Sequence, residues 1–200
     1  MIKLYHNPMT RSLRVLWLLE ELGLDYVLET VEFVPPTSGK AFVQHTPTGK
    51  FPTIEDGEIT MCESGAIVAY LIERYGGGRL TPPLDSPLRA KYLQWLHFPE
   101  GILNPYINAI QRFAALSPAI AADLGKELDR AIALIDNELA NHPYIVGEEF
   151  TGADIMLAVS LLSLNLMGLL GDRHSHIATY LARLQTSPAL VNALEKGTVE

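Results

Sequence analysis

The chain has 200 residues, enough for one domain or two small ones, and its 48% of hydrophobic and 19% of charged residues are typical of a globular protein. Its formal net charge of −8, from 15 basic and 23 acidic residues, argues against binding to a phosphate backbone, so we expect no nucleic-acid partner. Its single cysteine, Cys62, excludes an internal disulfide and suits a reducing cytoplasm.

The first part of the chain alternates strand and helix signals. In chain order, the patterns predict a strand at 2–5, a helix at 12–22 that Gly23 ends, a strand at 26–33, a loop at 34–52 with a short helix near 41–44, a hairpin at 53–62 and a helix at 64–76. Asp56-Gly57 in the hairpin favours a type I′ turn. This order predicts a mixed sheet with helices packed on it.

The segment "RLTPPLDSP", residues 79–87, is a linker, and after it the strand signals vanish. We therefore predict an α/β domain at 1–78 and an all-α domain at 88–200. The helical patterns of the second domain cover 88–115, 118–141, 151–170 and 177–184, with a short piece beyond Pro188. Thr151 and Asp154 have the spacing of a capping box for the third of these helices.

The segment that most resembles a membrane span is "IMLAVSLLSLNLMGLLG", residues 155–171. It reaches only the short end of spanning length and includes two serines and an asparagine, so we predict a core helix that is buried on all sides. The N-terminus lacks the apolar region of a signal peptide. We expect a soluble, cytoplasmic protein without a membrane partner.

Three stretches of the first domain are candidates for binding a charged ligand. Thr10-Arg11-Ser12 begins the first helix, where free backbone N–H groups and the helix dipole favour an anion or a thiolate. Lys50 precedes Phe51-Pro52, an X-Pro bond at a strand entry that can be cis. Glu63-Ser64 begins the next helix, where Ser64 offers a hydroxyl and a backbone N–H to a carboxylate.

Each stretch also has an ordinary interpretation when it is taken alone. Thr10 or Ser12 is a helix cap, Lys50 is a solvated loop lysine, and Glu63-Ser64 is a cap with an acid in the first turn. Cys62 is expected to be a small buried hydrophobic residue. The pair His174 and His176 lacks further ligands nearby in the sequence, so we expect no metal.

Together, these motifs resemble those of the cytosolic glutathione transferases. The resemblance covers nearly the whole chain and rests on "TRSLRVLWLLEELG", "PTGKFPT", "CESGAIVAYLIERYG", a Pro-rich linker and "TGAD". The likeness is greatest to bacterial and fungal members whose first helix reads S-R-S-x-R-x-L-W-L-L-E-E. It implies a thioredoxin-like N-terminal domain, an all-α C-terminal domain and a homodimer that binds glutathione.

The resemblance also implies roles for individual residues. Phe51-Pro52 matches the cis-proline element that binds the cysteinyl backbone of glutathione, and Lys50 matches a residue that meets its glycine carboxylate. Glu63 and Ser64 match the pair that holds the γ-glutamyl group, and Glu100 is expected to reach its ammonium group.

The chemistry requires glutathione to be held as a thiolate near neutral pH. Lowering a thiol pKa of about 8.5 by about 2 units needs roughly 2.7 kcal/mol, and one charge-assisted hydrogen bond contributes about 1.5–3 kcal/mol. Thr10 stands where the family usually has a serine, and its methyl group crowds the sulfur. Ser12 is the second candidate donor, Arg11 contributes a positive field, and Tyr5 ranks below them because it lies in a strand.

The predicted function is a glutathione transferase, in which the thiolate attacks a small hydrophobic electrophile. Met9, Tyr106 and Phe113 are the candidates for an apolar pocket that holds this electrophile. A related hypothesis is a glutathione-dependent peroxidase or disulfide reductase. The alternative is a non-catalytic protein that binds glutathione or a hydrophobic ligand, which the threonine in place of serine favours.

Overall fold

A computed structural model describes residues 1–31, 46, 48–171 and 173–198. The chain divides into two compact units, Met1–Gly78 with Gln185–Glu200, and Arg79–Leu184. The elements in chain order are β1 (Ile2–His6), α1 (Ser12–Leu22), β2 (Tyr26–Thr30), β3 (Thr53–Asp56), β4 (Ile59–Cys62), α2 (Ser64–Tyr75), α3 (Arg89–Phe98), the π-helical segment η3 (Pro99–Leu103), α4 (Asn104–Phe113), α5 (Pro118–Leu139), α6 (Gly152–Leu166), α7 (Ser175–Gln185) and α8 (Pro188–Gly197).

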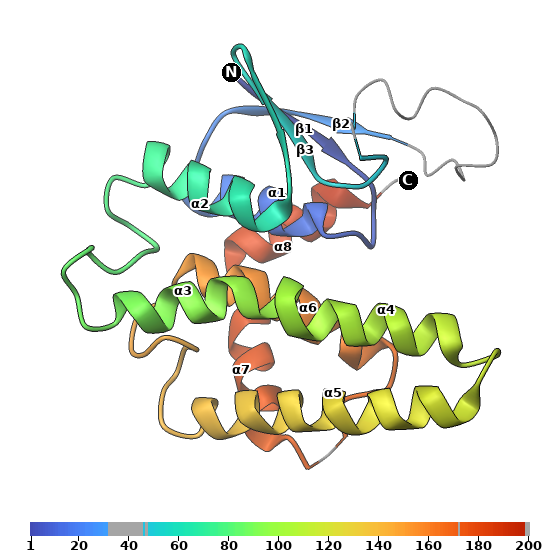
Figure 1. Ribbon diagram of the computed structural model, residues 1–200. Helices are drawn as coiled ribbons and strands as arrows, with labels where there is room; N and C mark the ends of the chain where they lie inside the picture. The colour runs from blue at the N-terminus through green and yellow to red at the C-terminus, as the bar shows by residue number, and fades with distance from the viewer. Residues whose placement is uncertain (32–45, 47, 172, 199–200) are drawn as a thin grey trace. The chain divides into compact units, whose positions relative to one another are not determined.

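The first unit is built on a mixed sheet with the strand order β2-β1-β3-β4. β1 runs parallel to β2 and antiparallel to β3, and β3 runs antiparallel to β4. Figure 1 shows α1 and α2 packed against this sheet, and fully buried side chains such as Leu4, Trp17 and Ile54 form the core between them. The predicted mixed sheet and the predicted helix at 12–22 are confirmed, and Gly23 ends this helix in the left-handed region with a φ of 68°.

The hairpin between β3 and β4 is confirmed, but its predicted type I′ turn is wrong. Asp56 pairs with Ile59 as the last rung of the ladder, so the loop consists of Gly57 and Glu58. Of these two residues only Gly57 has a positive φ, whereas a type I′ turn requires two. The Asp56 carboxylate accepts hydrogen bonds from Tyr70 and Tyr75 of α2, which hold this residue in the strand.

The C-terminal helix belongs to the first unit. We expected residues 88–200 to form one all-α domain, but residues from Gln185 onward group with residues 1–78, and α8 packs against α1. A helical pattern shows that a segment forms an amphipathic helix and does not show which surface covers its apolar face.

The helices of the second unit depart most clearly from their expected ranges in two places. The predicted helix at 88–115 is interrupted by the π-helical segment that begins at Pro99, a residue without an N–H to donate. α6 ends at Leu166 rather than at 170, because Gly168 adopts a left-handed φ of 68°. The capping box of Thr151 and Asp154 is present as predicted.

α6 is buried on all sides only in its first part. Its residues from Gly152 to Leu161 are buried, whereas Ser163, Asn165 and Leu166 in its last turn are exposed. Within the ranges that the structure describes, no helix is both long and apolar enough to cross a membrane.

Candidate functional site

The three candidate stretches of the first unit meet at one cavity of about 160 Å³. Its lining residues come from the start of α1, the entry to β3 and the start of α2: Arg11, Thr48, Lys50, Phe51, Pro52, Glu63 and Ser64. Six of these seven residues were candidates on sequence grounds. The exception is Thr48, which lies two residues before Lys50.

The entry to β3 combines buried apolar residues with an exposed basic residue. The Phe51-Pro52 peptide bond is cis, the isomer that the family resemblance implied. Phe51 is 5% exposed and Pro52 is buried, whereas Lys50 is exposed. The cavity is therefore lined both by the apolar residues Phe51 and Pro52 and by the basic residue Lys50.

The start of α2 holds Glu63 in an unusual backbone conformation. Glu63 has φ 73° and ψ 104°, a region that favours glycine, and it is exposed at the N-cap of the helix. Residues in such conformations cost about 1–3 kcal/mol and cluster at functional sites. A strained glutamate beside the free N–H groups of a helix start therefore supports a binding role for this position.

Ser64 is oriented by a residue of α1. Its side chain is buried, and its Oγ accepts a hydrogen bond of 2.9 Å from the Nη1 of Arg14, which has no exposed surface. Because the guanidinium occupies an acceptor position of the hydroxyl, the Ser64 O–H remains available to donate to a ligand. Arg14 was not a candidate on sequence grounds.

The two hydroxyls at the start of α1 differ in burial. Ser12 has no exposed surface, and its Oγ lies 2.8 Å from His6 Nδ1 and 2.7 Å from Thr10 Oγ1. Thr10 is half-buried, and its Oγ1 donates to the Asn7 carbonyl at 2.7 Å and accepts from the Ser12 backbone N–H at 3.3 Å. Thus Thr10, rather than Ser12, is the residue of this pair that has exposed surface.

Neither hydroxyl is a helix cap of the ordinary kind. The N-cap of α1 is Arg11, whose side chain makes no cap hydrogen bond, and the Thr10 hydroxyl bonds to the N–H of the first helical residue. Arg11 lines the cavity, whereas Thr10 and Ser12 are not among its lining residues.

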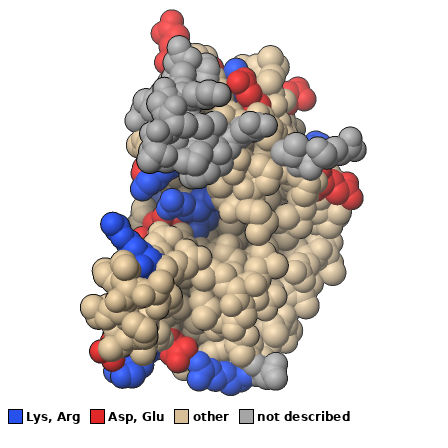
Figure 2. Space-filling view, turned by 90° about the vertical axis from the view of Figure 1, so that its right-hand side faces the viewer, with Lys and Arg blue, Asp and Glu red and all other residues tan. Residues whose placement is uncertain are grey.

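The charges around the cavity are of both signs. Arg11 and Lys50 supply positive charge and Glu63 supplies negative charge, so the cavity suits a zwitterionic ligand that carries a net negative charge. On the face drawn in Figure 2, the basic and acidic side chains of the described residues occur in small separate groups. This distribution suits a small charged molecule better than a polyanion.

Three further candidates of the first unit have clear environments. Met9 is 84% exposed and has a left-handed φ of 60°. Tyr5 is buried in β1 and donates a hydrogen bond of 2.8 Å to Glu55, and burial raises the pKa of its phenol. Cys62, which we expected to be fully buried, is only half-buried in β4, because it lies on the strand at the edge of the sheet.

The remaining candidates lie in the second unit. Glu100, in η3, accepts a hydrogen bond of 2.5 Å from Asn104, and Tyr106 and Phe113 are both half-buried on α4. His176 lies 2.9 Å from Asp136, and His174 accepts a hydrogen bond from Arg173. In the ranges described, no three metal-ligating side chains of His, Cys, Asp or Glu come together.

Comparisons with known proteins identify a family. Two family models match the chain, "Glutathione S-transferase, N-terminal domain" over residues 1–73 and "Glutathione S-transferase, C-terminal domain" over residues 108–183. The chain is 32% identical to glutathione S-transferase GstB of Escherichia coli, over 92% of each chain. It is 29% identical to glutathione S-transferase 3 of Schizosaccharomyces pombe, over 98% of this chain and 88% of that protein.

Solved structures agree with the sequence comparisons. A sphingomonad glutathione S-transferase complexed with glutathione is 26% identical, with a TM-score of 0.86 over 99% of this chain and 100% of that chain. The expected fold class, a thioredoxin-like N-terminal domain followed by a helical domain, is therefore confirmed.

Proposed function

Because the chain belongs to the glutathione S-transferase family, we propose that it binds glutathione in the cavity at the starts of α1 and α2 and activates its thiol for attack on a small hydrophobic electrophile. The observation that carries this proposal is the convergence of Lys50, Phe51-Pro52 and Glu63-Ser64 on one cavity. The related sphingomonad structure, which contains glutathione, supports the same ligand.

The charges of the cavity complement both ends of glutathione. Lys50 pairs with the glycine carboxylate, and the Ser64 hydroxyl with the free N–H groups of α2 receives the γ-glutamyl carboxylate. Glu63 accepts hydrogen bonds from the ammonium group of the same γ-glutamyl unit. The backbone of Phe51, beside the cis bond, is the partner of the cysteinyl unit between them.

Thr10 is the proposed donor to the sulfur. Ser12 is fully buried among protein partners, whereas Thr10 is half-buried, and its hydroxyl can donate to the sulfur once it leaves the Asn7 carbonyl. A hydrogen bond to a thiolate, worth about 1.5–3 kcal/mol, lowers the thiol pKa by about 1–2 units. Arg11, which lines the cavity, adds a positive field.

The proposal extends to residues and partners outside the cavity. We further propose apolar contacts with the electrophile for Met9, Tyr106 and Phe113, a contact with the glutathione ammonium group for Glu100, and a homodimer in a reducing cytoplasm as the active form. Peroxide reduction uses the same thiolate, so organic peroxides are the second substrate class to assay.

Thiolate absorbance and turnover test the proposal together. We expect glutathione to bind in calorimetry, to give thiolate absorbance at neutral pH and to be consumed with an aryl halide. Thr10→Ser keeps the hydroxyl and should retain activity, whereas Thr10→Val keeps the size and should lose about 10- to 100-fold in kcat/KM. Binding without thiolate absorbance would instead identify a non-catalytic glutathione-binding protein, and equal activity of the two variants would remove Thr10 from its role.

A further inference from the structure

A chain of hydrogen bonds leads from Thr10 into the interior of the first unit. Thr10 Oγ1 lies 2.7 Å from Ser12 Oγ, Ser12 Oγ lies 2.8 Å from His6 Nδ1, and His6 Nε2 lies 3.0 Å from the Gly197 carbonyl oxygen. His6 and Ser12 are 1% and 0% exposed. These hydrogen bonds therefore join the half-buried residue Thr10 to the buried imidazole of His6.

The Gly197 carbonyl determines the tautomer of His6. A carbonyl oxygen only accepts, so Nε2 carries a hydrogen, and in the neutral imidazole Nδ1 is then an acceptor. It follows that Ser12 donates its hydroxyl hydrogen to Nδ1, so that a hydrogen bond between the two hydroxyls has Thr10 as its donor. Burial lowers the pKa of His6, which keeps the ring neutral in the free protein.

We propose that bound glutathione passes its thiol proton to His6 through the hydroxyls of Thr10 and Ser12, an inference that rests on the proposed function. The S–H bond breaks as Thr10 Oγ1 takes the proton, and the electron pair stays on sulfur. Thr10 gives its own hydrogen to Ser12, and Ser12 gives its own to His6 Nδ1. The products are a thiolate and an imidazolium, and both hydroxyls are neutral again.

Every donor in the chain has an acceptor before and after the transfer. Before it, S–H donates to Thr10, Thr10 to Ser12, and Ser12 to Nδ1. After it, the imidazolium Nδ1–H donates to Ser12, Ser12 to Thr10, and Thr10 to the thiolate, while Nε2–H stays on Gly197. The thiolate and the imidazolium form in one step, so their attraction offsets the unfavourable burial of each charge. His6 is thus a positioning residue and a proton acceptor that acts through two hydroxyls.

The backbone groups of Asn7 compete for the hydrogen bonds of the Thr10 and Ser12 hydroxyls. The Asn7 carbonyl lies 2.7 Å from Thr10 Oγ1 and 3.1 Å from Ser12 Oγ, and the Asn7 N–H lies 3.3 Å from Ser12 Oγ. Without glutathione, the Thr10 hydroxyl donates to this carbonyl. A thiol that donates to Thr10 Oγ1 leaves the hydroxyl hydrogen free to turn toward Ser12, only 2.7 Å away.

Both hydrogen-bond partners of the His6 ring in the described part of the chain are uncharged. These partners are the Ser12 hydroxyl from α1 and the Gly197 carbonyl from α8. Several charged residues of the neighbouring elements have partners of their own, and buried Arg14 of α1 donates to Ser64. Lys3 of β1 pairs with Glu29 of β2, the Lys196 ammonium pairs with Glu20, and Glu195 is exposed.

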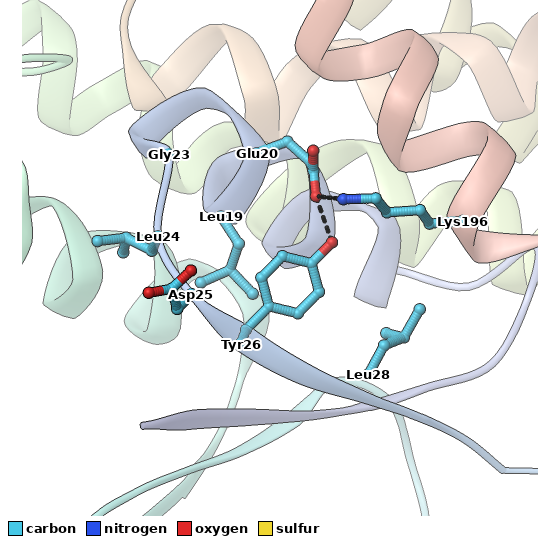
Figure 3. Close-up of a pocket in the computed structure, with 8 residues that line it drawn as sticks. All are labelled: Leu19, Glu20, Gly23, Leu24, Asp25, Tyr26, Leu28 and Lys196. Atoms are coloured by element: carbon cyan, nitrogen blue, oxygen red, sulfur yellow. Dashed lines mark hydrogen bonds and ion pairs between the residues drawn. The ribbon is translucent and has the colours of Figure 1, made fainter.

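α8 is held in place at its last turn, as Figure 3 shows. The Lys196 Nζ lies 2.6 Å from Glu20 Oε1, which also accepts a hydrogen bond from Tyr26. A Cβ atom at Gly197 would lie 3.0 Å from His6 Nε2 and 3.1 Å from Leu16 Cδ2. The Gly197 carbonyl, which fixes the tautomer of His6, therefore lies at the end of α8. The Lys196–Glu20 ion pair holds this end in place, and it has no room for a side chain at position 197.

Nitrogen NMR of histidine-labelled protein tests the transfer directly. On saturation with glutathione at pH 7, the ring nitrogens of His6 should shift from the pattern of a neutral Nε2–H tautomer to that of an imidazolium. S-methylglutathione, which has no thiol proton, should leave the neutral pattern unchanged. His6→Asn assigns the signals, and slow solvent exchange of the buried Nε2–H assigns them if that variant does not fold.

Thiolate absorbance of the same sample separates the two proposals. Thiolate with a neutral His6 would overturn the relay and leave the proposed function intact. No thiolate in the wild type would overturn the proposed function and the relay with it. Thr10→Val interrupts the chain at its accessible end, so its His6 should stay neutral with glutathione, and an imidazolium in that variant would also overturn the relay.

Discussion

The guanidinium of Arg14, buried in α1, donates a hydrogen bond of 2.9 Å to the hydroxyl of Ser64, the first residue of α2. This bond connects the two helices whose N-termini form the cavity. It sets the direction in which Ser64 can donate, so an interior residue controls a group at the binding surface.

Arg14→Met should weaken glutathione binding about 10-fold, because the Ser64 hydroxyl loses the donor that orients it. The thiol pKa of the glutathione that still binds should be unchanged, since Thr10 is untouched. A double-mutant cycle with Ser64→Ala, followed by calorimetry, should give a coupling of about 1–3 kcal/mol. Additive effects on affinity would mean that Arg14 acts on binding independently of Ser64.

Glu63→Gly should stabilise the fold and weaken glutathione binding. Glycine relieves the backbone conformation at φ 73°, so the free energy of unfolding should rise by about 1 kcal/mol. Glutathione affinity should fall at least 10-fold, because the ammonium group loses its acceptor. Glu63→Gln keeps the strained backbone and isolates the charge. Urea denaturation with calorimetry checks both, and unchanged affinity of the glycine variant would contradict a binding role.

The titration of Asp154 should raise the free energy of unfolding in mild acid relative to neutral pH. Complete burial raises the pKa of Asp154 to about 6, although four hydrogen bonds partly offset the effect. The native state therefore binds more protons than the unfolded chain between about pH 4 and pH 6, so this contribution is full below pH 4 and is lost as the pH rises through 6.

Asp154→Asn removes this titration. The stability of the wild type relative to the variant should fall by roughly 3 kcal/mol between pH 4 and pH 7, measured by urea denaturation. The difference is informative because Asp56, Asp136 and Glu20, whose pKa values are lowered, act in the opposite direction and are common to both proteins. A pH-independent difference would contradict the raised pKa.

Gly197→Ala should destabilise the protein by about 1–3 kcal/mol, because its Cβ atom meets the His6 ring and Leu16 at close to 3 Å. Gly125→Ala in α5 is the matched control: its Cβ atom meets nothing within 4 Å, so it should stabilise the helix by about 0.5–1 kcal/mol. Thermal unfolding of both variants checks the contrast. Equal effects would show that α8 can move away from His6.

The features that could be predicted from the sequence are those that depend on local patterns. The periodicity from Ser12 to Leu22, the glycine at 23, the hairpin and the capping box of Thr151 each depend on neighbours within a few residues. The cavity was also predictable in part, because Lys50 and the Glu63-Ser64 pair belong to short motifs.

Contacts between residues far apart in the chain were not predictable in the same way. His6 and Gly197 are 191 positions apart, and Arg14 and Ser64 are 50 positions apart. Nothing in the sequence near Arg14 distinguishes a buried guanidinium from an exposed one. The helical pattern of α8 likewise fits either unit, since amphipathicity does not name the partner surface.

The packing of α8 on α1 has a consequence for the order in which the protein is made. Residues 79–184 must all leave the ribosome before α8 can cover the apolar face of α1. The unit that begins translation is therefore the last to be completed, with part of its core open to water while the other unit is already free to fold. For this interval, the apolar face of α1 that α8 will cover stays exposed.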